Sequence, residues 1–156
     1  MISTDVLSNI RKIVRSINLE SKRIQKDYGV SIPQVLCLNY LYSSPNFQST
    51  QGDVKNFLHL NSSTVSGIIQ RLEKKGFIAR LPKTGDKRVT NLTLTVSGQK
   101  ILQHIPPLLH DRLSTKLEKL NEDEIDTIKK SLVQLVNLLQ IEDVDASPLI
   151  TNDELL

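Results

Sequence analysis

The sequence predicts a mainly α-helical fold with one small β-hairpin. Apolar residues recur at the helical period of about 3.6 residues along most of the chain. A single β-rich region, in contrast, surrounds a turn cluster at Pro82–Asp86. Aromatic residues make up only 4% of the 156 residues and Trp is absent, so Ile, Leu and Val should form the core. A chain of this length favours one domain.

Two helices are expected in the first part of the chain. The first should run from about Asp5 to Tyr28 and end at Gly29, which is a favourable C-terminal cap. The second should begin near Ile32, with Pro33 in its first turn, where the missing N–H costs nothing. The apolar side of the first helix consists of Ile10, Ile13, Val14, Ile17 and Ile24.

The next two helices form a predicted helix-turn-helix. Ser49 or Thr50 can cap a short helix that ends near Leu58. After a three-residue turn, Asn61 can cap a second helix over Ser62–Lys75. Two short helices joined by such a turn define this motif.

A β-hairpin is expected directly after the second of these helices, which Gly76 should end. Phe77–Leu81 and Val89–Thr95 are rich in β-forming residues, and the turn cluster lies between them. A charged hairpin at this place is a wing. The sequence therefore predicts a winged helix-turn-helix with helical regions before and after it.

The last part of the chain should be helical. Thr95 can cap a helix that Pro106 and Pro107 kink or break. Asn121 and Glu124 resemble a capping box at the start of the final helix. That helix carries an apolar seam with spacings of 3, 4, 3 and 4, typical of a coiled-coil-like contact, formed by Ile125, Ile128, Leu132, Leu135 and Leu139.

Charge is segregated along the chain. The net charge is only +3, but residues 142–156 contain five acidic and no basic side chains. Residues 55–100 contain nine Lys or Arg and two acidic side chains. A concentrated basic segment is typical of a protein that binds the phosphates of nucleic acid. A solvated basic face is the alternative that charge alone leaves open.

Several classes of protein are disfavoured. No apolar run approaches the roughly 18 residues of a membrane-spanning helix, and Met1–Arg15 lacks the apolar region of a signal peptide. Cys37 is the single cysteine, which excludes an internal disulfide and favours a cytoplasmic location. We find no phosphate-binding glycine loop and no nucleophile motif, so we expect neither an enzyme nor a cofactor.

Metal and redox roles are also disfavoured. His104 and His110 are six residues apart, whereas a helical pair of metal ligands uses a spacing of four. We therefore expect no metal site. Cys37 is a redox sensor or a small buried apolar residue, and its apolar neighbours favour burial.

Taken together, these residues resemble the MarR family of winged-helix regulators over about residues 5–141. The matching stretches are Ile32–Leu38, Leu60–Ser66 and Arg71–Ile78. The most specific match is Asp86–Gly98, which has the wing pattern Asp-x-Arg followed by Leu-Thr-x-x-Gly.

The resemblance implies a ligand-responsive repressor that binds double-stranded DNA as a homodimer on a pseudo-palindromic operator. A small molecule of unknown identity or an oxidant would control it. It implies a single domain over residues 1–141, with a winged lobe at 32–98 and dimerisation helices at 5–28 and 99–141. Residues 142–156 would form a flexible acidic tail.

The resemblance also assigns roles to residues. The helix from Ser62 to Arg71 would enter the major groove, Arg88 would reach the minor groove, and Asp86 would steady the wing through an ion pair. The residues expected to contact DNA are Ser62, Ser63, Thr64, Ser66, Gln70, Arg71, Lys87 and Arg88.

Two positions depart from the family pattern. Gly67 stands where a larger, often basic, residue is common, and His59 stands in the turn where glycine is common. His tolerates a left-handed backbone better than most residues. The alternative function is a winged helix that binds proteins rather than DNA. RNA binding is disfavoured because the basic segment has few aromatic residues, such as Phe77, that could stack on bases.

Overall fold

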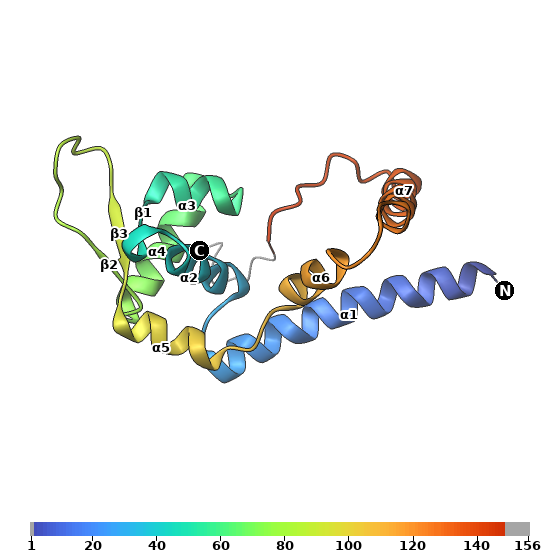
Figure 1. Ribbon diagram of the computed structural model, residues 1–156, viewed down its shortest axis with the longest axis horizontal. Helices are drawn as coiled ribbons and strands as arrows, with labels where there is room; N and C mark the ends of the chain where they lie inside the picture. Colours follow the sequence, from blue (N-terminus) through green and yellow to red (C-terminus); the bar gives the residue numbers. More distant parts are fainter. Residues whose placement is uncertain (1, 149–156) are drawn as a thin grey trace. The chain divides into compact units, whose positions relative to one another are not determined.

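The computed structural model describes residues 2–148 and is mainly helical, with one three-stranded antiparallel sheet (Figure 1). The predicted fold class is confirmed. The described residues form two compact units, one containing residues 2–106 together with 147–148 and the other containing residues 107–146. Within residues 2–148, no helix is both long enough and apolar enough to cross a membrane.

The elements follow the predicted order. They are α1 (Ile2–Tyr28), α2 (Ile32–Tyr42), the 3-10 helix η1 (Pro45–Phe47), β1 (Gln48–Thr50), α3 (Gln51–Leu58), α4 (Ser62–Lys74), β2 (Ile78–Arg80), β3 (Asn91–Leu94), α5 (Val96–His104), α6 (Leu109–Leu117) and α7 (Glu122–Leu139). The α3–α4 pair is the predicted helix-turn-helix, and the β2–β3 hairpin is the predicted wing.

The core of the first unit lies among α2, α3, α4 and the sheet. Its buried residues are Cys37, Leu38, Leu41, Val54, Leu58, Leu60, Val65, Ile68, Ile69, Leu72, Ile78, Leu92 and Leu94. Removing such a side chain from water contributes roughly 1.5–3 kcal/mol, so this cluster is the main source of stability. The burial of Cys37 agrees with its interpretation as a small apolar core residue.

Local capping explains where the helices of this unit begin and end. Ser31 and Gln34 form a capping box at α2, and Thr50 accepts a hydrogen bond from the Asp53 N–H at 3.0 Å at α3. Gly29 ends α1 with a φ of +69°. These capping interactions satisfy backbone groups that a helix end otherwise leaves unpaired.

The sheet departs from the prediction in two ways. The strand order is β1-β3-β2, and β1 was not predicted. It has three residues, too few for a recognisable period, and pairing with β3 defines it (Ser49 opposite Leu92). The hairpin strands are also shorter than expected, because residues 81–90 form a long loop, here called the wing loop.

A close junction connects the end of α4 to the start of α5. Gly76 has a φ of +80°, and the Phe77 N–H donates to the Leu72 carbonyl at 3.0 Å, which completes the end of α4. The Thr95 hydroxyl donates to the Gly76 carbonyl at 2.6 Å and accepts from the Gly98 N–H at 3.1 Å. A Cβ on Gly98 would lie 2.2 Å from the Phe77 carbonyl oxygen, so only glycine fits there.

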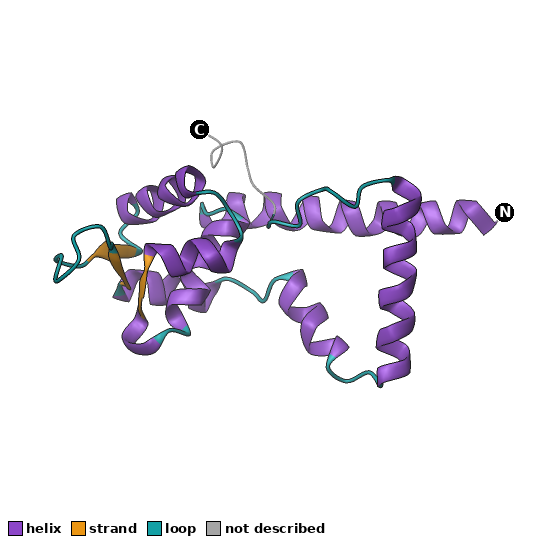
Figure 2. Cartoon of the chain, turned by 90° about the horizontal axis from the view of Figure 1, so that it is seen from above, coloured by secondary structure: helices purple, strands orange, loops and turns teal. Residues whose placement is uncertain are grey.

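The second unit contains α6 and α7, two helices joined by a short loop (Figure 2). The predicted break at Pro106 and Pro107 is confirmed, because α5 ends at His104 and α6 begins at Leu109. The predicted capping box of α7 is also confirmed: Asn121 accepts from the Glu124 N–H at 2.9 Å. Of the predicted acidic tail, residues 149–156 lie outside the described residues.

The Gly98 contact gives a stability prediction. We expect Gly98→Ala to lower the free energy of unfolding by about 1–3 kcal/mol, because the new methyl group meets backbone atoms that cannot rotate away. Urea denaturation at one protein concentration measures this. The control is Gly52→Ala, because a Cβ there has only an ordinary 3.8 Å contact with Thr50 Oγ1. Equal stability of the two variants would show that α5 does not need this close approach.

Candidate nucleic-acid interface

The start of α4 is exposed at Ser62 and Ser63, and the first N–H groups of an α-helix have no partner within the helix. Asn61 caps the helix by accepting from the Thr64 N–H at 2.8 Å, and the Ser63 hydroxyl donates to the Asn61 side chain at 2.9 Å. His59, which lies two residues before Asn61 and ends α3, has a φ of +54°. Histidine tolerates this left-handed backbone better than most residues do. A helix N-terminus has a partial positive charge that attracts phosphate.

The helix α4 has one buried and one exposed side. Val65, Ile68, Ile69 and Leu72 face the core. Among the predicted contact residues, Ser62, Ser63 and Gln70 are exposed, whereas Ser66 and Arg71 are half-buried.

Thr64 is the exception among the predicted contact residues, because it is only 8% exposed. It lies four residues before Ile68 and therefore on the core side of α4. The helical period was sufficient to place it there.

The two helices of the helix-turn-helix are connected by a side-chain hydrogen bond. Gln51 at the start of α3 donates to the Ser66 hydroxyl at 3.0 Å. Ser66 therefore belongs to the exposed side of α4 but also holds α3 and α4 together. Residue spacing could not predict this contact, because it joins residues 15 positions apart.

Some basic residues of the segment 55–100 have internal roles. The Lys75 ammonium group donates to the Gly29 carbonyl and, at 3.1 Å, to Gln34 Oε1, so it ties the end of α4 to the α1–α2 connection. Arg80 pairs with Glu73 at 3.3 Å. The positive charges of these side chains remain, but their positions are set by contacts within the lobe.

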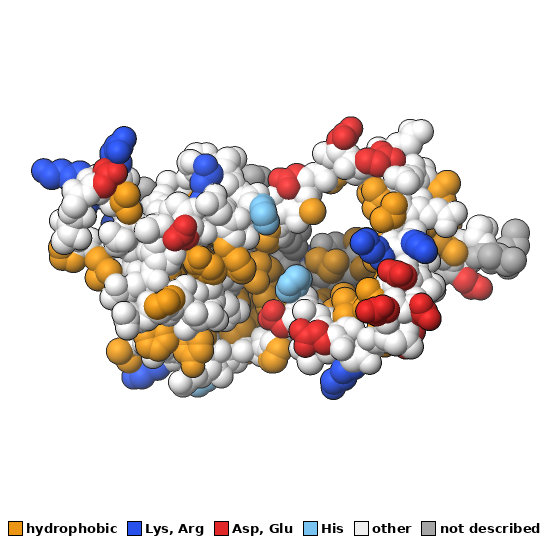
Figure 3. Space-filling view, turned by 45° about the horizontal axis from the view of Figure 1, so that its top comes forward, with side chains coloured by type: hydrophobic (Ala, Val, Ile, Leu, Met, Phe, Trp, Pro, Cys, Tyr) orange, Lys and Arg blue, Asp and Glu red, His pale blue; other side chains and the backbone are white. Residues whose placement is uncertain are grey.

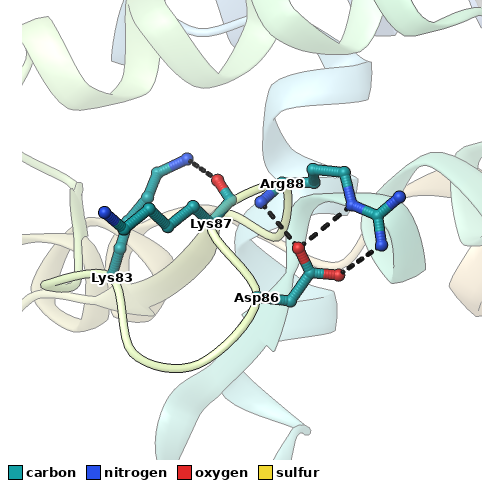
Figure 4. A network of polar contacts seen from close by, with 4 residues as sticks. All are labelled: Lys83, Asp86, Lys87 and Arg88. Atoms are coloured by element: carbon teal, nitrogen blue, oxygen red, sulfur yellow. Dashed lines mark hydrogen bonds and ion pairs between the residues drawn. The ribbon is translucent and has the colours of Figure 1, made fainter.

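The wing loop carries the exposed charged side chains Lys83, Asp86, Lys87 and Arg88, which contact one another (Figure 4). The Arg88 guanidinium donates two hydrogen bonds to Asp86, from Nε to Oδ1 at 3.1 Å and from Nη2 to Oδ2 at 3.1 Å. The Arg88 backbone N–H donates to Oδ1 at 3.0 Å. The Lys83 ammonium donates to the Lys87 carbonyl at 2.6 Å. The ion pair expected for Asp86 is therefore present, and its partner is Arg88.

The ion pair holds Arg88 without burying it. The Arg88 side chain is 91% exposed. Lys and Arg side chains gather at the end of the wing loop, with an acidic side chain between them (Figure 3). The wing thus presents an oriented guanidinium to solvent, and such a group can enter a narrow groove of negative potential.

The two Arg88 side-chain hydrogen bonds lower the pKa of Asp86 from its usual 3.8, with the Arg88 N–H and the Lys83 charge acting in the same direction. Because the folded-state pKa is depressed, the stabilising contribution of the carboxylate is present above pH 3.8 and is lost as the pH falls through the lowered pKa. At neutral pH the pair is fully charged.

Comparisons with known proteins identify the class to which this lobe belongs. The family model described as "MarR family" matches residues 30–90, from the start of α2 through the wing loop. The haem sensor PefR from Streptococcus agalactiae, in a crystal structure with haem, is 32% identical, with a TM-score of 0.61, covering 90% of this chain and 97% of that one.

Other relatives agree with this match. The crystal structure of the S. aureus MepR–DNA complex is 25% identical, with a TM-score of 0.63, over 83% of this chain and 95% of that one. The Bacillus subtilis protein YsmB, an uncharacterised helix-turn-helix transcriptional regulator, is 27% identical over 84% of this chain and 88% of its own length. The chain is a winged helix-turn-helix transcriptional regulator that binds DNA. It belongs to the MarR family.

The Asp86–Arg88 pair can be tested by titration. We expect carboxyl NMR of wild-type protein to give Asp86 a pKa below 3.8. Arg88→Ala should raise this pKa most, because it removes the largest cause of the shift. Lys83→Ala should raise it less, because it removes only a charge interaction. If the Asp86 pKa is the same in wild type and Arg88→Ala, the ion pair does not form in solution.

Proposed function

We propose that the chain is a homodimeric, ligand-responsive repressor that places two α4 helices in successive major grooves of a pseudo-palindromic operator. The observation that carries this proposal is the exposure, in one lobe, of both the polar side of α4 and the Asp86–Arg88 pair of the wing loop. The solved complex of MepR with DNA and the B. subtilis repressor YetL, 22% identical over 89% of this chain, support it. Such a repressor acts in the cytoplasm and catalyses no reaction.

The proposed contacts are of two kinds, those to the phosphates of DNA and those to its bases or grooves. Ser62, Ser63 and the exposed N–H groups at the start of α4 bind phosphate and fix the register. Gln70 and Arg71 lie further along the helix and read base edges. Lys87 binds phosphate, and Arg88 enters the minor groove beside the site. Thr64 and Ser66 support the helix rather than reading DNA.

The wing gives a prediction for binding. Arg88→Ala should weaken operator binding by about 1–3 kcal/mol, the cost of one good contact, with the largest loss on A·T-rich flanks. Lys87→Ala should cost less, show no preference for flanking sequence and reduce the salt slope by about one. Salt titrations on operators that differ only in their flanks measure both effects. An equal loss on A·T-rich and G·C-rich flanks would make Arg88 a phosphate contact.

Exposed apolar residues support the dimer. In α1 they are Val6, Leu7, Ile13, Val14, Ile17 and Leu19. In α7 they are Ile128, Leu132, Val133, Leu138 and Leu139. Each set lies on a helix that its own unit leaves partly uncovered, and several large exposed apolar side chains on one helix indicate an interface. We propose that a second copy of the chain covers them.

The dimer interface can be tested by one charge. Leu132 is 52% exposed on α7, and Leu132→Glu should convert the dimer to a monomer, because the carboxylate would be buried without a partner. Analytical ultracentrifugation measures the mass. Lys130→Glu, an exposed charge change on the same helix, is the matched control and should leave the dimer intact. A Leu132→Glu variant that stays dimeric would remove this part of α7 from the interface.

The effector is a small molecule that changes the affinity for DNA. Haem is the first compound to test, because PefR was crystallised with it. Haem iron takes His ligands, and His104 and His110 are both exposed. A haem needs only one or two such ligands. Residues 2–148 contain no cluster of three or more His, Cys, Asp or Glu that could hold a bare metal ion. Haem absorption spectra and release of the protein from operator DNA distinguish binding from regulation.

A further inference from the structure

Gly67 and Arg71 form a matched pair on α4. A Cβ built on Gly67 would lie 2.8 Å from Arg71 Nη1, 3.7 Å from Cζ and 3.9 Å from Nη2. The guanidinium of Arg71 therefore lies over Gly67, one turn before its own position. This is the direction expected for a long helical side chain, because Cα–Cβ bonds lean toward the helix N-terminus.

In this arrangement the charged end of Arg71 lies on a different part of the α4 surface from its Cα. Arg71 is half-buried at the border between the core side and the exposed side. Gly67 is also half-buried, and its neighbours on the polar side of α4 are the exposed Ser63, four residues before it, and Gln70, three residues after it. By folding over Gly67, the guanidinium reaches the polar surface that the proposed function assigns to DNA.

The fold does not require glycine at this position. Glycine in a helix interior is less favourable than alanine. The backbone of Gly67 is not among the glycines with positive φ in the described part of the chain. The atoms nearest to its missing Cβ belong to the flexible end of one side chain, whereas those around Gly98 include backbone. A side chain at 67 would therefore displace Arg71 and leave the core unchanged.

We propose that Gly67 is a specificity-determining residue that lets the Arg71 guanidinium read a guanine in each half of the operator. Arginine bonded to guanine O6 and N7 is the commonest specific contact in the major groove. A guanidinium has five N–H donors, so contacts within the protein and a contact to a base are compatible. This inference rests on the proposed function.

The first test compares two glycine variants. Wild type, Gly67→Ala and Gly52→Ala are used to select bound sequences from a random duplex library, and the affinity for the wild-type site is then measured. We expect Gly67→Ala to remain folded and to lose roughly 5- to 150-fold of its preference for guanine at one position per half-site, the range that a bidentate contact supplies. Gly52→Ala should keep the wild-type preference.

The second test asks whether Gly67 acts through Arg71. Arg71→Lys keeps the charge but not the bidentate geometry, so it should lose the same guanine preference with an unchanged salt slope. In the Arg71→Lys background, Gly67→Ala should have no further effect on that preference. A further loss of the same size would overturn the proposal, because Gly67 would then act by its own close approach to DNA.

The outcomes also separate this inference from the function on which it rests. If wild-type protein selects no sequence, specific operator binding itself is wrong. If wild type selects a defined site and Gly67→Ala selects the same site with the same affinity, the operator function stands and the role of Gly67 is wrong. Thermal melting of each variant shows whether a loss of binding reflects loss of the fold.

Discussion

The rest of the structure depends on the burial of one side of α4. Val65, Ile68, Ile69 and Leu72 are each 0% exposed, and together they fix the rotation of the helix about its axis. Turning the helix by one residue, about 100°, would bring polar side chains into the core at a cost of several kcal/mol. The core therefore decides which residues α4 can present to DNA, and the caps at Asn61 and Gly76 decide where that surface begins and ends.

The contacts at the junction after α4 fix the position of the wing hairpin relative to that helix. Leu94 packs into the core, Thr95 bonds to both Gly76 and Gly98, and Gly98 lies against the backbone of Phe77. These contacts explain why the pattern Leu-Thr-x-x-Gly has those residue types in this order. The pattern serves packing, whereas the Asp-x-Arg pattern in the wing loop orients an exposed charge. Two parts of one motif thus have different physical purposes.

Basic charge in this protein has both structural and electrostatic roles. Lys75 ties α4 to the connection between α1 and α2, and Arg80 pairs with Glu73. Arg88 is held by Asp86, which costs some positive potential but limits the orientations of the guanidinium. An ion pair this exposed contributes little to stability. Its effect is to orient the Arg88 guanidinium in the free protein, before DNA binds.

The sequence by itself determined the helices, their caps and the order of the elements. Asn61, Thr95 and the Asn121–Glu124 box were recognisable because a cap bonds to groups within a few residues along the chain. The burial of Thr64 was also within reach of the helical period. These features are local, so a short stretch of residues contains all the information.

The tertiary structure alone decided the contacts between distant residues. Examples are the pairing of β1 with β3, the bond from Gln51 to Ser66, and the reach of Lys75 to Gly29. Two local contacts, between Asp86 and Arg88 and between Arg71 and Gly67, were decided by the side-chain rotamers of the folded protein. The distant contacts depend on how packed elements approach one another, which residue spacing does not specify. For the local pairs, spacing makes a contact possible, and the rotamer that each side chain adopts decides whether it forms.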